Sequence, residues 1–428
     1  MSFWSVIKYY LKHSNLHGLH HIADEKTSIF YRFAWLFIVL LSTLGMMRIF
    51  KSSYDSYLQH SISFATETTY LNWNTTFPAI SVCEIAGTEV FWTADPSENY
   101  SPMQQFLSDI IFFTGSCYSC STNCVECKEM NYKSLVRQYR KKCTSLIGKC
   151  KWNDVEFDCC DHFLPLNTEY GWCFAINSIH TIRQKGMKQQ QMFSNRFTGP
   201  GQLVIENIDD IRLYIHAPED VPFINSDTDL RKEVVLGERY QLDFKVIEIA
   251  NDENVRSVNV EKRGCRFPDE IYPELKVHKF YSYSTCIVQC HADAHINLCN
   301  CTHHLMPVVG DANYCNIEGL LCLTEYFETV NRLHAKGFDK PGLVCDCVPS
   351  CVEPEYNIVS ENKGVKSSNG EISIRLQALP TLRFKRNVVR TTLDLVVSIG
   401  GTAGLFVGAS LLSIIETVYL LILRRNYN

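Results

Sequence analysis

The sequence has no cysteine before Cys83 and none after Cys351, although it contains 20 cysteines in 428 residues. Cytosolic proteins rarely accumulate so many thiols in one block, whereas an oxidising compartment accounts for them directly. The central part of the chain is therefore predicted to lie outside the cytosol. An ordinary cytosolic enzyme is excluded as the leading hypothesis.

A strong net charge and the common catalytic signatures are also lacking. The formal net charge is −5, without the basic excess of a nucleic-acid-binding surface. There is no HExxH pair, P-loop, GxGxxG after a strand or GxSxG elbow. The adjacent histidines His20-His21 and His303-His304 are interpreted as solvated or packed side chains and not as metal ligands. Adjacent side chains point in different directions and so do not converge on one ion. We expect no enzymatic activity, no nucleic-acid partner, no metal and no cofactor.

Two long apolar runs flank the cysteine-rich part, at residues 29–50 and 392–423. The second contains 21 consecutive residues without a charge, from Leu395 to Ile415. Each run is long enough to cross a bilayer, which needs about 20 helical residues. The first run also fits a signal peptide, but it begins late and lacks a small-residue cleavage site before Arg48, so a retained transmembrane helix is favoured.

Two spans place both ends of the chain on one side of the membrane. Basic residues near the spans are evenly divided, so they do not decide the orientation. The cysteines decide it, and two glycosylation sequons agree, at Asn74-Thr75-Thr76 and Asn99-Tyr100-Ser101. We predict a plasma-membrane protein with residues 51–391 extracellular and with residues 1–28 and 424–428 cytosolic.

The extracellular part is predicted to be an α+β domain. Residues 78–83, 202–216, 234–249 and 371–376 have the β-branched, partly alternating pattern of strands, which suggests one central antiparallel sheet. Residues 363–370 are typical of a hairpin turn or a short loop. The cluster of Cys117, Cys120, Cys124 and Cys127 fits zinc, but an oxidising compartment favours disulfides.

The second span carries features that a simple anchor does not need. Asp394 stands at its start and Glu416 near its end, with Gly400, Gly404 and Gly408 on one helical face between them. On a continuous helix the two carboxylates would be about 33 Å apart and about 40° apart around the axis. Intramembrane carboxylates usually face a protein interior or a water-filled path, although Asp394 alone fits the headgroup region equally well. The glycines permit close helix packing, and the combination favours an oligomeric, cation-conducting pore.

At this point several motifs resemble those of the degenerin/epithelial sodium channel family. The run at 400–410 (GGTAGLFVGAS) followed by Glu416 resembles its pore signature, and Ser14-x-x-His17-Gly18 resembles its His-Gly gating motif. Residues 77–83 (FPAISVC) and 171–177 (GWCFAIN) resemble motifs of its palm, although FAI at 174–176 departs from the usual aromatic-Thr-Phe. The cysteine order from Tyr281 to Cys351 resembles its thumb. The matches span nearly the whole chain and look most like the insect pickpocket branch.

The resemblance implies a homotrimer, or a heterotrimer with related subunits, of acid-sensing-channel-like architecture. Its parts would be a finger and knuckle at 84–198, a palm and β-ball at 199–264, a thumb at 265–351 and returning palm strands at 352–391. It also implies the disulfides Cys83–Cys173, Cys265–Cys351, Cys286–Cys347, Cys290–Cys345, Cys299–Cys322 and Cys301–Cys315.

The resemblance further assigns roles in the pore. Gly408, Ala409 and Ser410 would form the selectivity filter at an interruption of the helix, and Asp394 and Glu416 would be pore carboxylates. Gating would involve His17, Gly18 and either Val397 or Ser398. The expected function is a sodium-selective, amiloride-type channel opened by an extracellular stimulus or ligand that the sequence does not identify. A two-span scavenger-type receptor that binds ligand without conducting is the alternative.

Overall fold

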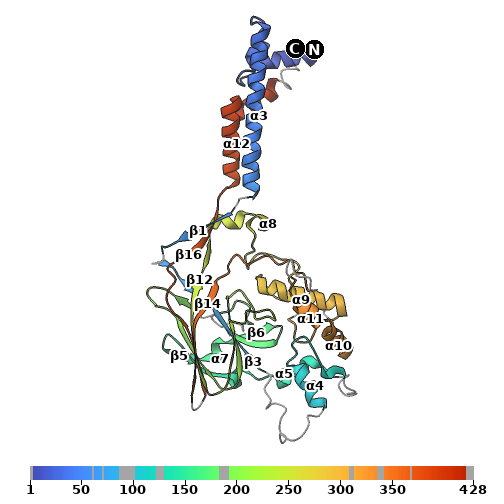
Figure 1. The fold of residues 1–428 in the computed structure, drawn as a ribbon, viewed down its shortest axis with the longest axis vertical. Helices are drawn as coiled ribbons and strands as arrows, with labels where there is room; N and C mark the ends of the chain where they lie inside the picture. The colour runs from blue at the N-terminus through green and yellow to red at the C-terminus, as the bar shows by residue number, and fades with distance from the viewer. Residues whose placement is uncertain are drawn as a thin grey trace. The chain divides into compact units, whose positions relative to one another are not determined.

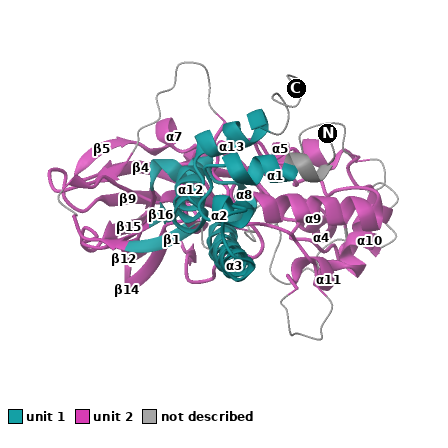
Figure 2. Cartoon of the chain, turned by 90° about the horizontal axis from the view of Figure 1, so that it is seen from above, with its two compact units in different colours: residues 1–65, 252–263, 386–428 teal, residues 66–251, 264–385 magenta. Residues whose placement is uncertain are grey.

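The computed structural model describes residues 3–59, 62–69, 72–85, 102–121, 130–182, 192–307, 313–334, 342–366 and 369–420. The chain forms two compact units, which Figure 2 shows in different colours. Unit 1 comprises residues 1–65, 252–263 and 386–428, and unit 2 comprises residues 66–251 and 264–385. Asn99 of the second sequon, Cys124 and Cys127, and the whole of 424–428 lie outside the described residues.

Unit 1 is helical. Its elements are α1 (Phe3–His13), α2 (Leu19–Ala23), α3 (Ile29–Gln59), the 3-10 helix η5 (Glu253–Ser257), α8 (Val260–Arg263), α12 (Thr392–Val407) and α13 (Leu411–Val418). Helices α3 and α12 run side by side (Figure 1). The segment at 252–263 joins this unit through Lys262, whose Nζ lies 4.5 Å from the centre of the Tyr57 ring on α3.

Helix α3 is longer than the predicted span of 29–50, because it continues in helical conformation to Gln59. Its apolar part, from Ile29 to Leu58, is long and apolar enough to cross a membrane. A 31-residue helix is about 46 Å long, which exceeds the roughly 30 Å of the hydrocarbon core. The more polar turns from Lys51 onward account for the additional length.

Unit 2 contains two large sheets. The first has the strand order β14 (Glu355–Val365), β12 (Glu238–Ile247), β15 (Gly370–Leu376), β9 (Gln202–Asn207), β4 (Ile147–Trp152) and β5 (Val155–Asp158). The second has the order β11 (Arg231–Val234), β10 (Ile211–His216), β3 (Ala79–Glu84), β7 (Gly171–Ile176) and β6 (Leu164–Thr168). Buried side chains of both sheets, such as Val82, Leu213, Ile205 and Leu242, share one hydrophobic core.

The prediction of one antiparallel sheet was therefore wrong in two respects. The apolar run at 202–216 divides at Ile208 to Asp210 into β9 and β10, which belong to different sheets. In addition, β12 pairs with β15 in parallel. Of the two alternatives for residues 363–370, the hairpin turn is excluded, because β14 and β15 flank β12 on opposite sides and do not pair with each other.

The remaining described strands are short: β1 (Ile62–Glu67), β2 (Thr75–Thr76), β8 (Phe193–Ser194), β13 (Ile249–Asn251) and β16 (Arg383–Val388). The helices of unit 2 are α4 (Pro102–Ile111), η3 (Ser119–Ser121), α5 (Tyr132–Tyr139), α6 (Cys143–Leu146), α7 (Cys159–His162), α9 (Tyr283–Cys299), α10 (Ile317–Glu325) and α11 (Phe327–Asn331). Helix α9 starts with a capping box between Ser282 and Thr285 and ends at Asn300, which adopts a left-handed conformation with φ 56°.

Nine disulfides hold the described part of unit 2. Six are the pairs that the resemblance implies, and each has the expected partner. The other three are Cys117–Cys120, Cys143–Cys160 and Cys150–Cys159. Because Cys117 and Cys120 are bonded to each other, the cluster at 117–127 does not supply four thiolates to a zinc ion.

Candidate functional site

The second span is broken at Gly408, Ala409 and Ser410. Gly408 ends α12 in a left-handed conformation with φ 65°, a conformation that favours glycine. Ser410 begins α13, and its side chain accepts a hydrogen bond from the backbone N–H of Ser413. The two helices are bent by 69°. The regular backbone ladder is thus interrupted at the residues that the resemblance assigns to the filter.

The break also changes the geometry predicted for Asp394 and Glu416. The separation of about 33 Å and 40° assumed a continuous helix and does not apply to a helix bent by 69°. Asp394 lies in the first turn of α12, where its Oδ2 accepts hydrogen bonds of 2.8 Å from both the backbone N–H and the hydroxyl of Thr391. A carboxylate there stabilises the positive end of the helix dipole. Asp394 is therefore a helix cap, and it has no contact with Glu416.

The His-Gly motif lies against the broken segment. The backbone N–H of His17 donates to the Val407 carbonyl at 3.0 Å, and a Cβ atom added to Gly408 would overlap the His17 imidazole. Gly18 has φ 84°, and a Cβ atom there would lie 2.7 Å from Val39 Cγ2 on α3. The absence of side chains at Gly18 and Gly408 lets this loop pack between α3 and the end of α12.

Sequence reasoning missed Asn15. Its side-chain amide nitrogen donates to both carboxylate oxygens of Glu416, at 2.9 Å and 2.7 Å. A second contact joins the same two segments, between the Tyr10 and Thr417 hydroxyls at 3.2 Å. The only signal in the sequence was that Asn15 stands two residues before His17. The N-terminal segment thus contacts both the break in the span and the carboxylate beyond it.

The other residues assigned to the second span face two environments. The Ser398 hydroxyl lies 3.2 Å from that of Ser53 on α3, whereas Val397 is 65% exposed. No described atom of the chain lies within 4 Å of a Cβ placed at Gly400, and one at Gly404 would meet only the Ala409 carbonyl at 3.7 Å. The α3–α12 packing instead uses Gly45, against which the Phe406 ring lies. Among the described residues, the face of α12 is therefore open at Gly400 and Gly404 and covered by His17 at Gly408.

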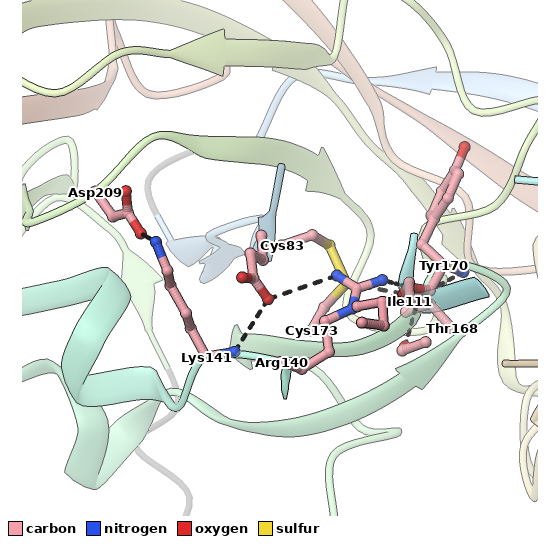
Figure 3. Close-up of polar contacts among 10 residues, drawn as sticks. Cys83, Ile111, Arg140, Lys141, Thr168, Tyr170, Cys173 and Asp209 are labelled. Carbon is pink, nitrogen blue, oxygen red and sulfur yellow. Dashed lines mark hydrogen bonds and ion pairs between the residues drawn. A yellow bond between two sulfur atoms is a disulfide. The ribbon is translucent and has the colours of Figure 1, made fainter. Parts of the chain in front are cut away.

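A buried polar cluster in unit 2, centred on Arg140, was also missed. Figure 3 shows the Arg140 guanidinium among residues of several elements. It donates to the carbonyls of Ile111, at the end of α4, and Tyr170, in the β6–β7 turn, at 3.2 Å and 2.6 Å. It also lies 3.8 Å from the Glu84 carboxylate on β3. One side chain therefore ties the helical part of 84–198 to the five-stranded sheet.

The electrostatics of this cluster follow from burial. The side chains of Arg140 and Glu84 are 9% and 4% exposed. Burial lowers the pKa of Arg140 to about 10, because desolvation disfavours its charge and outweighs the attraction of Glu84. Burial likewise raises the pKa of Glu84, against the opposing effect of Arg140. The Cys83–Cys173 disulfide lies beside the pair and joins β3 to β7 (Figure 3).

Several histidines of unit 2 are packed in its interior. His303 and His304 are both buried, and burial lowers the pKa of each, that of His304 to about 4. The Nδ1 atom of His291 lies 2.5 Å from the Oε1 atom of the buried Glu169. The described residues contain no group of three or more His, Cys, Asp or Glu placed to hold a metal ion. Asn74 of the first sequon is exposed, and it accepts a hydrogen bond from Asn195 at 3.0 Å.

An apolar helix that can span a membrane, a second span broken at three small residues and a large disulfide-bonded α+β unit define the class of two-span channel proteins. The family profile described as "Amiloride-sensitive sodium channel" matches residues 10–420. The chain belongs to this family, whose members are ion channels and not enzymes.

Individual relatives cover nearly the whole chain. "Sodium channel protein Nach" of Drosophila ananassae is 21% identical over 466 residues, with 97% of this chain and 86% of that protein covered. "Pickpocket protein 19" of Drosophila melanogaster is 22% identical, with 96% and 89% covered. "Bile acid-sensitive ion channel" of Mus musculus is 22% identical, with 95% and 85% covered. These matches confirm the resemblance to the family and to the pickpocket proteins.

Proposed function

We propose that the chain is a subunit of a sodium-selective cation channel in the plasma membrane, with α12 and α13 lining the pore. The observation that carries this proposal is the break at Gly408, Ala409 and Ser410, with the His-Gly loop packed against it. Three subunits, identical or related, would surround the pore. Unit 2 would be extracellular and both ends of the chain cytosolic, which agrees with nine disulfides in the described part of unit 2.

Selectivity would arise at the break. Three small residues in each of three subunits allow backbone carbonyls to approach the axis and replace part of the hydration shell of a cation. The open face of α12 at Gly400 supports this arrangement, because a Cβ placed there would meet no described atom beyond the backbone of its own helix. Glu416 would attract cations on the inner side of the filter, where Asn15 holds its carboxylate.

Gating would involve the contact between α12 and α3. Ser398 contacts Ser53 on α3, and the neighbouring Val397 is exposed. A bulky side chain at Ser398 would push α12 away from α3, and one at Val397 would act on a neighbouring subunit; either would hold the pore open. An extracellular stimulus would act through unit 2, whose disulfides constrain the unfolded chain and rigidify the thumb-like segment.

The test is whole-cell recording from cells that express the chain with Val397→Trp or Ser398→Trp, alone and with related subunits. We expect a constitutive, amiloride-sensitive sodium current. Robust surface expression with no current in any combination would contradict the proposal and favour the non-conducting scavenger-type receptor. A receptor without a pore does not require the broken span or the loop packed against it.

A further inference from the structure

Unit 2 contains a cavity of about 170 Å³ that the proposed pore does not use. The loop that follows β10, the first residues of α9 and the residues just before β14 line it. Aromatic rings form much of its wall, contributed by Tyr214, Phe223, Tyr283 and Tyr356. Its volume resembles that of cavities that accept a ligand with one aromatic ring.

The charged side chains that line the cavity are all acidic. Asp220, Asp227 and Glu353 line the cavity, and its lining, all of it within the described residues, includes no lysine or arginine. Rings that present their faces and a carboxylate together form an environment that attracts a positively charged group. A neutral ligand would gain hydrogen bonds at most from these three carboxylates, and an anionic ligand would be repelled by them.

The one basic side chain in the wall, His216, is neutral. Its Nδ1 lies 2.8 Å from the Ala217 carbonyl, which requires Nδ1 to carry a proton and donate. Its Nε2 then accepts from the Ser81 hydroxyl at 2.7 Å. Burial lowers the pKa of His216 to about 4, which agrees with this assignment. The imidazole therefore neither repels a cation nor offers it a free nitrogen.

One polar group of the wall lacks a hydrogen-bond partner among the described residues. The Tyr356 side chain is 6% exposed, and its hydroxyl has no hydrogen-bond partner among the described residues. Asp220, by contrast, is hydrogen-bonded: it accepts a 2.7 Å hydrogen bond from the Ser284 hydroxyl, in the first turn of α9, and further hydrogen bonds from the Ser282 side chain and the Ser284 backbone. It takes part in no ion pair among the described residues. Buried polar groups without partners are uncommon in folded proteins and indicate a missing ligand or water.

We propose that this cavity binds a small organic ammonium ion carrying one aromatic ring, with Asp220 as the counter-ion. A metal ion is a poorer fit, because the described residues contain no group of three or more ligating side chains placed to hold one. Ser284 joins Asp220 to the start of α9, whose Cys286 and Cys290 are both disulfide-bonded. Binding therefore takes place at the base of the cross-linked helix. This inference goes beyond the proposed conduction and does not depend on it.

The experiment is calorimetric titration of the purified full chain with 2-phenylethylammonium at constant ionic strength. The matched ligand is 2-phenylethanol, which has the same ring and chain length but no charge. We expect saturable binding of the ammonium, and at least tenfold weaker binding of the alcohol. Asp220→Asn should weaken ammonium binding at least tenfold, whereas Glu325→Gln, an exposed carboxylate on α10 outside the cavity, should leave it unchanged.

A second variant keeps the test decisive if Asp220→Asn fails to fold. Leu230→Trp fills the cavity without removing a charge and should abolish binding of the ammonium. Equal binding of the alcohol, binding that survives Leu230→Trp, or saturable calcium binding that Asp220→Asn removes would each overturn the proposal. The titration measures binding and not current, so the two proposals fail independently. A chain that binds the ammonium but does not conduct would contradict only the proposed function, and one that conducts but does not bind would contradict only this inference.

Discussion

The side-chain amide of Asn15 donates to both carboxylate oxygens of Glu416, at 2.9 Å and 2.7 Å, across 401 positions of sequence. The amide fixes the orientation of the carboxylate without adding a positive charge to it. In the proposed pore, the negative charge of Glu416 therefore remains available to cations. The N-terminal segment becomes part of the permeation path.

Replacement of Asn15 by Asp should increase block of the current by cytosolic Mg²⁺. Asn15→Asp removes the donor and places a second carboxylate beside Glu416, and paired carboxylates bind divalent cations more tightly than one does. We expect a several-fold lower concentration for half-block in inside-out patches. Asn15→Gln, which keeps an amide, and the double variant Asn15→Asp with Glu416→Gln, which restores the charge, should both approach the wild-type value. If Asn15→Asp leaves the Mg²⁺ block unchanged, Asn15 and Glu416 lie outside the permeation path.

Gly408→Ala should disrupt the break in the second span. Gly408 has φ 65°, and a Cβ atom would overlap the His17 ring. The left-handed conformation alone costs a non-glycine residue about 1–2 kcal/mol. We expect a large loss of current at unchanged total protein, measured by recording and surface biotinylation. Gly401→Ala is the matched control, because Gly401 lies outside the glycine face and a Cβ there would have no contact within 4 Å beyond its own helix backbone. Equal effects of the two variants would contradict the argument.

Changing Ser410 should alter the sodium-to-potassium permeability ratio. Ser410 is the first residue after the break, and its hydroxyl caps α13. Ser410→Ala removes the cap, and Ser410→Cys replaces its oxygen with sulfur, so both alter the backbone at the proposed filter. Reversal potentials measured under bi-ionic conditions give the ratio. A permeability ratio that neither variant changes would remove the filter assignment.

Removal of Arg140 should destabilise unit 2 strongly. Arg140→Met leaves the carboxylate of Glu84 buried without its cationic partner, which typically costs about 3–5 kcal/mol. We expect a clear fall in the denaturation midpoint of the purified chain, and partial recovery when Glu84→Gln is added. Arg375→Met is the control, since its ion pair with Asp243 is largely exposed on the arginine side and such pairs contribute about 0–1 kcal/mol. An equal fall in the denaturation midpoints of Arg140→Met and Arg375→Met would contradict the importance assigned to the buried pair of Arg140 and Glu84.

His304 should make unit 2 less stable as the pH falls. Its pKa is about 4 in the folded chain because of burial, whereas an unfolded histidine has a pKa of about 6.5. Between these values only the unfolded chain binds the proton, so stability declines as pH falls from about 6.5 to about 4, by up to about 1.4 kcal/mol per pH unit.

His304→Gln should remove this component, so that its denaturation midpoint depends less on pH than that of the wild type. The comparison with wild type is necessary because burial raises the pKa of Glu219 to about 7, which stabilises the folded chain on acidification. His334→Gln, at an exposed histidine, is the control. Parallel pH profiles for wild type and His304→Gln would contradict the assignment.

The sequence predicted the structure best where a family motif fixes the spacing between cysteines. The cysteine order from Cys265 to Cys351 led, through the family resemblance, to five pairs that are present in the structure. The division of residues 202–216 between two sheets was not predictable from alternation, because both halves have the same period and the turn between them is only three residues long.

Long-range polar contacts were the main omission. Arg140 lies in the charged sequence QYRKK at 138–142, which resembles a solvated surface, and only the fold brings it to Glu84 and Tyr170. Asn15 occupies an unspecified position of the Ser14-x-x-His17-Gly18 motif, and its partner lies 401 positions away. Such contacts carry no local periodicity, so pattern analysis has nothing to detect.

The nested disulfides also determine what a protease would do to this protein. A single cut between Cys322 and Cys345 would leave the two fragments joined by Cys265–Cys351, Cys286–Cys347 and Cys290–Cys345. The nicked chain would migrate as one species until a reductant separated it into two. Limited proteolysis could thus loosen this segment locally while the whole polypeptide remained anchored at both of its spans.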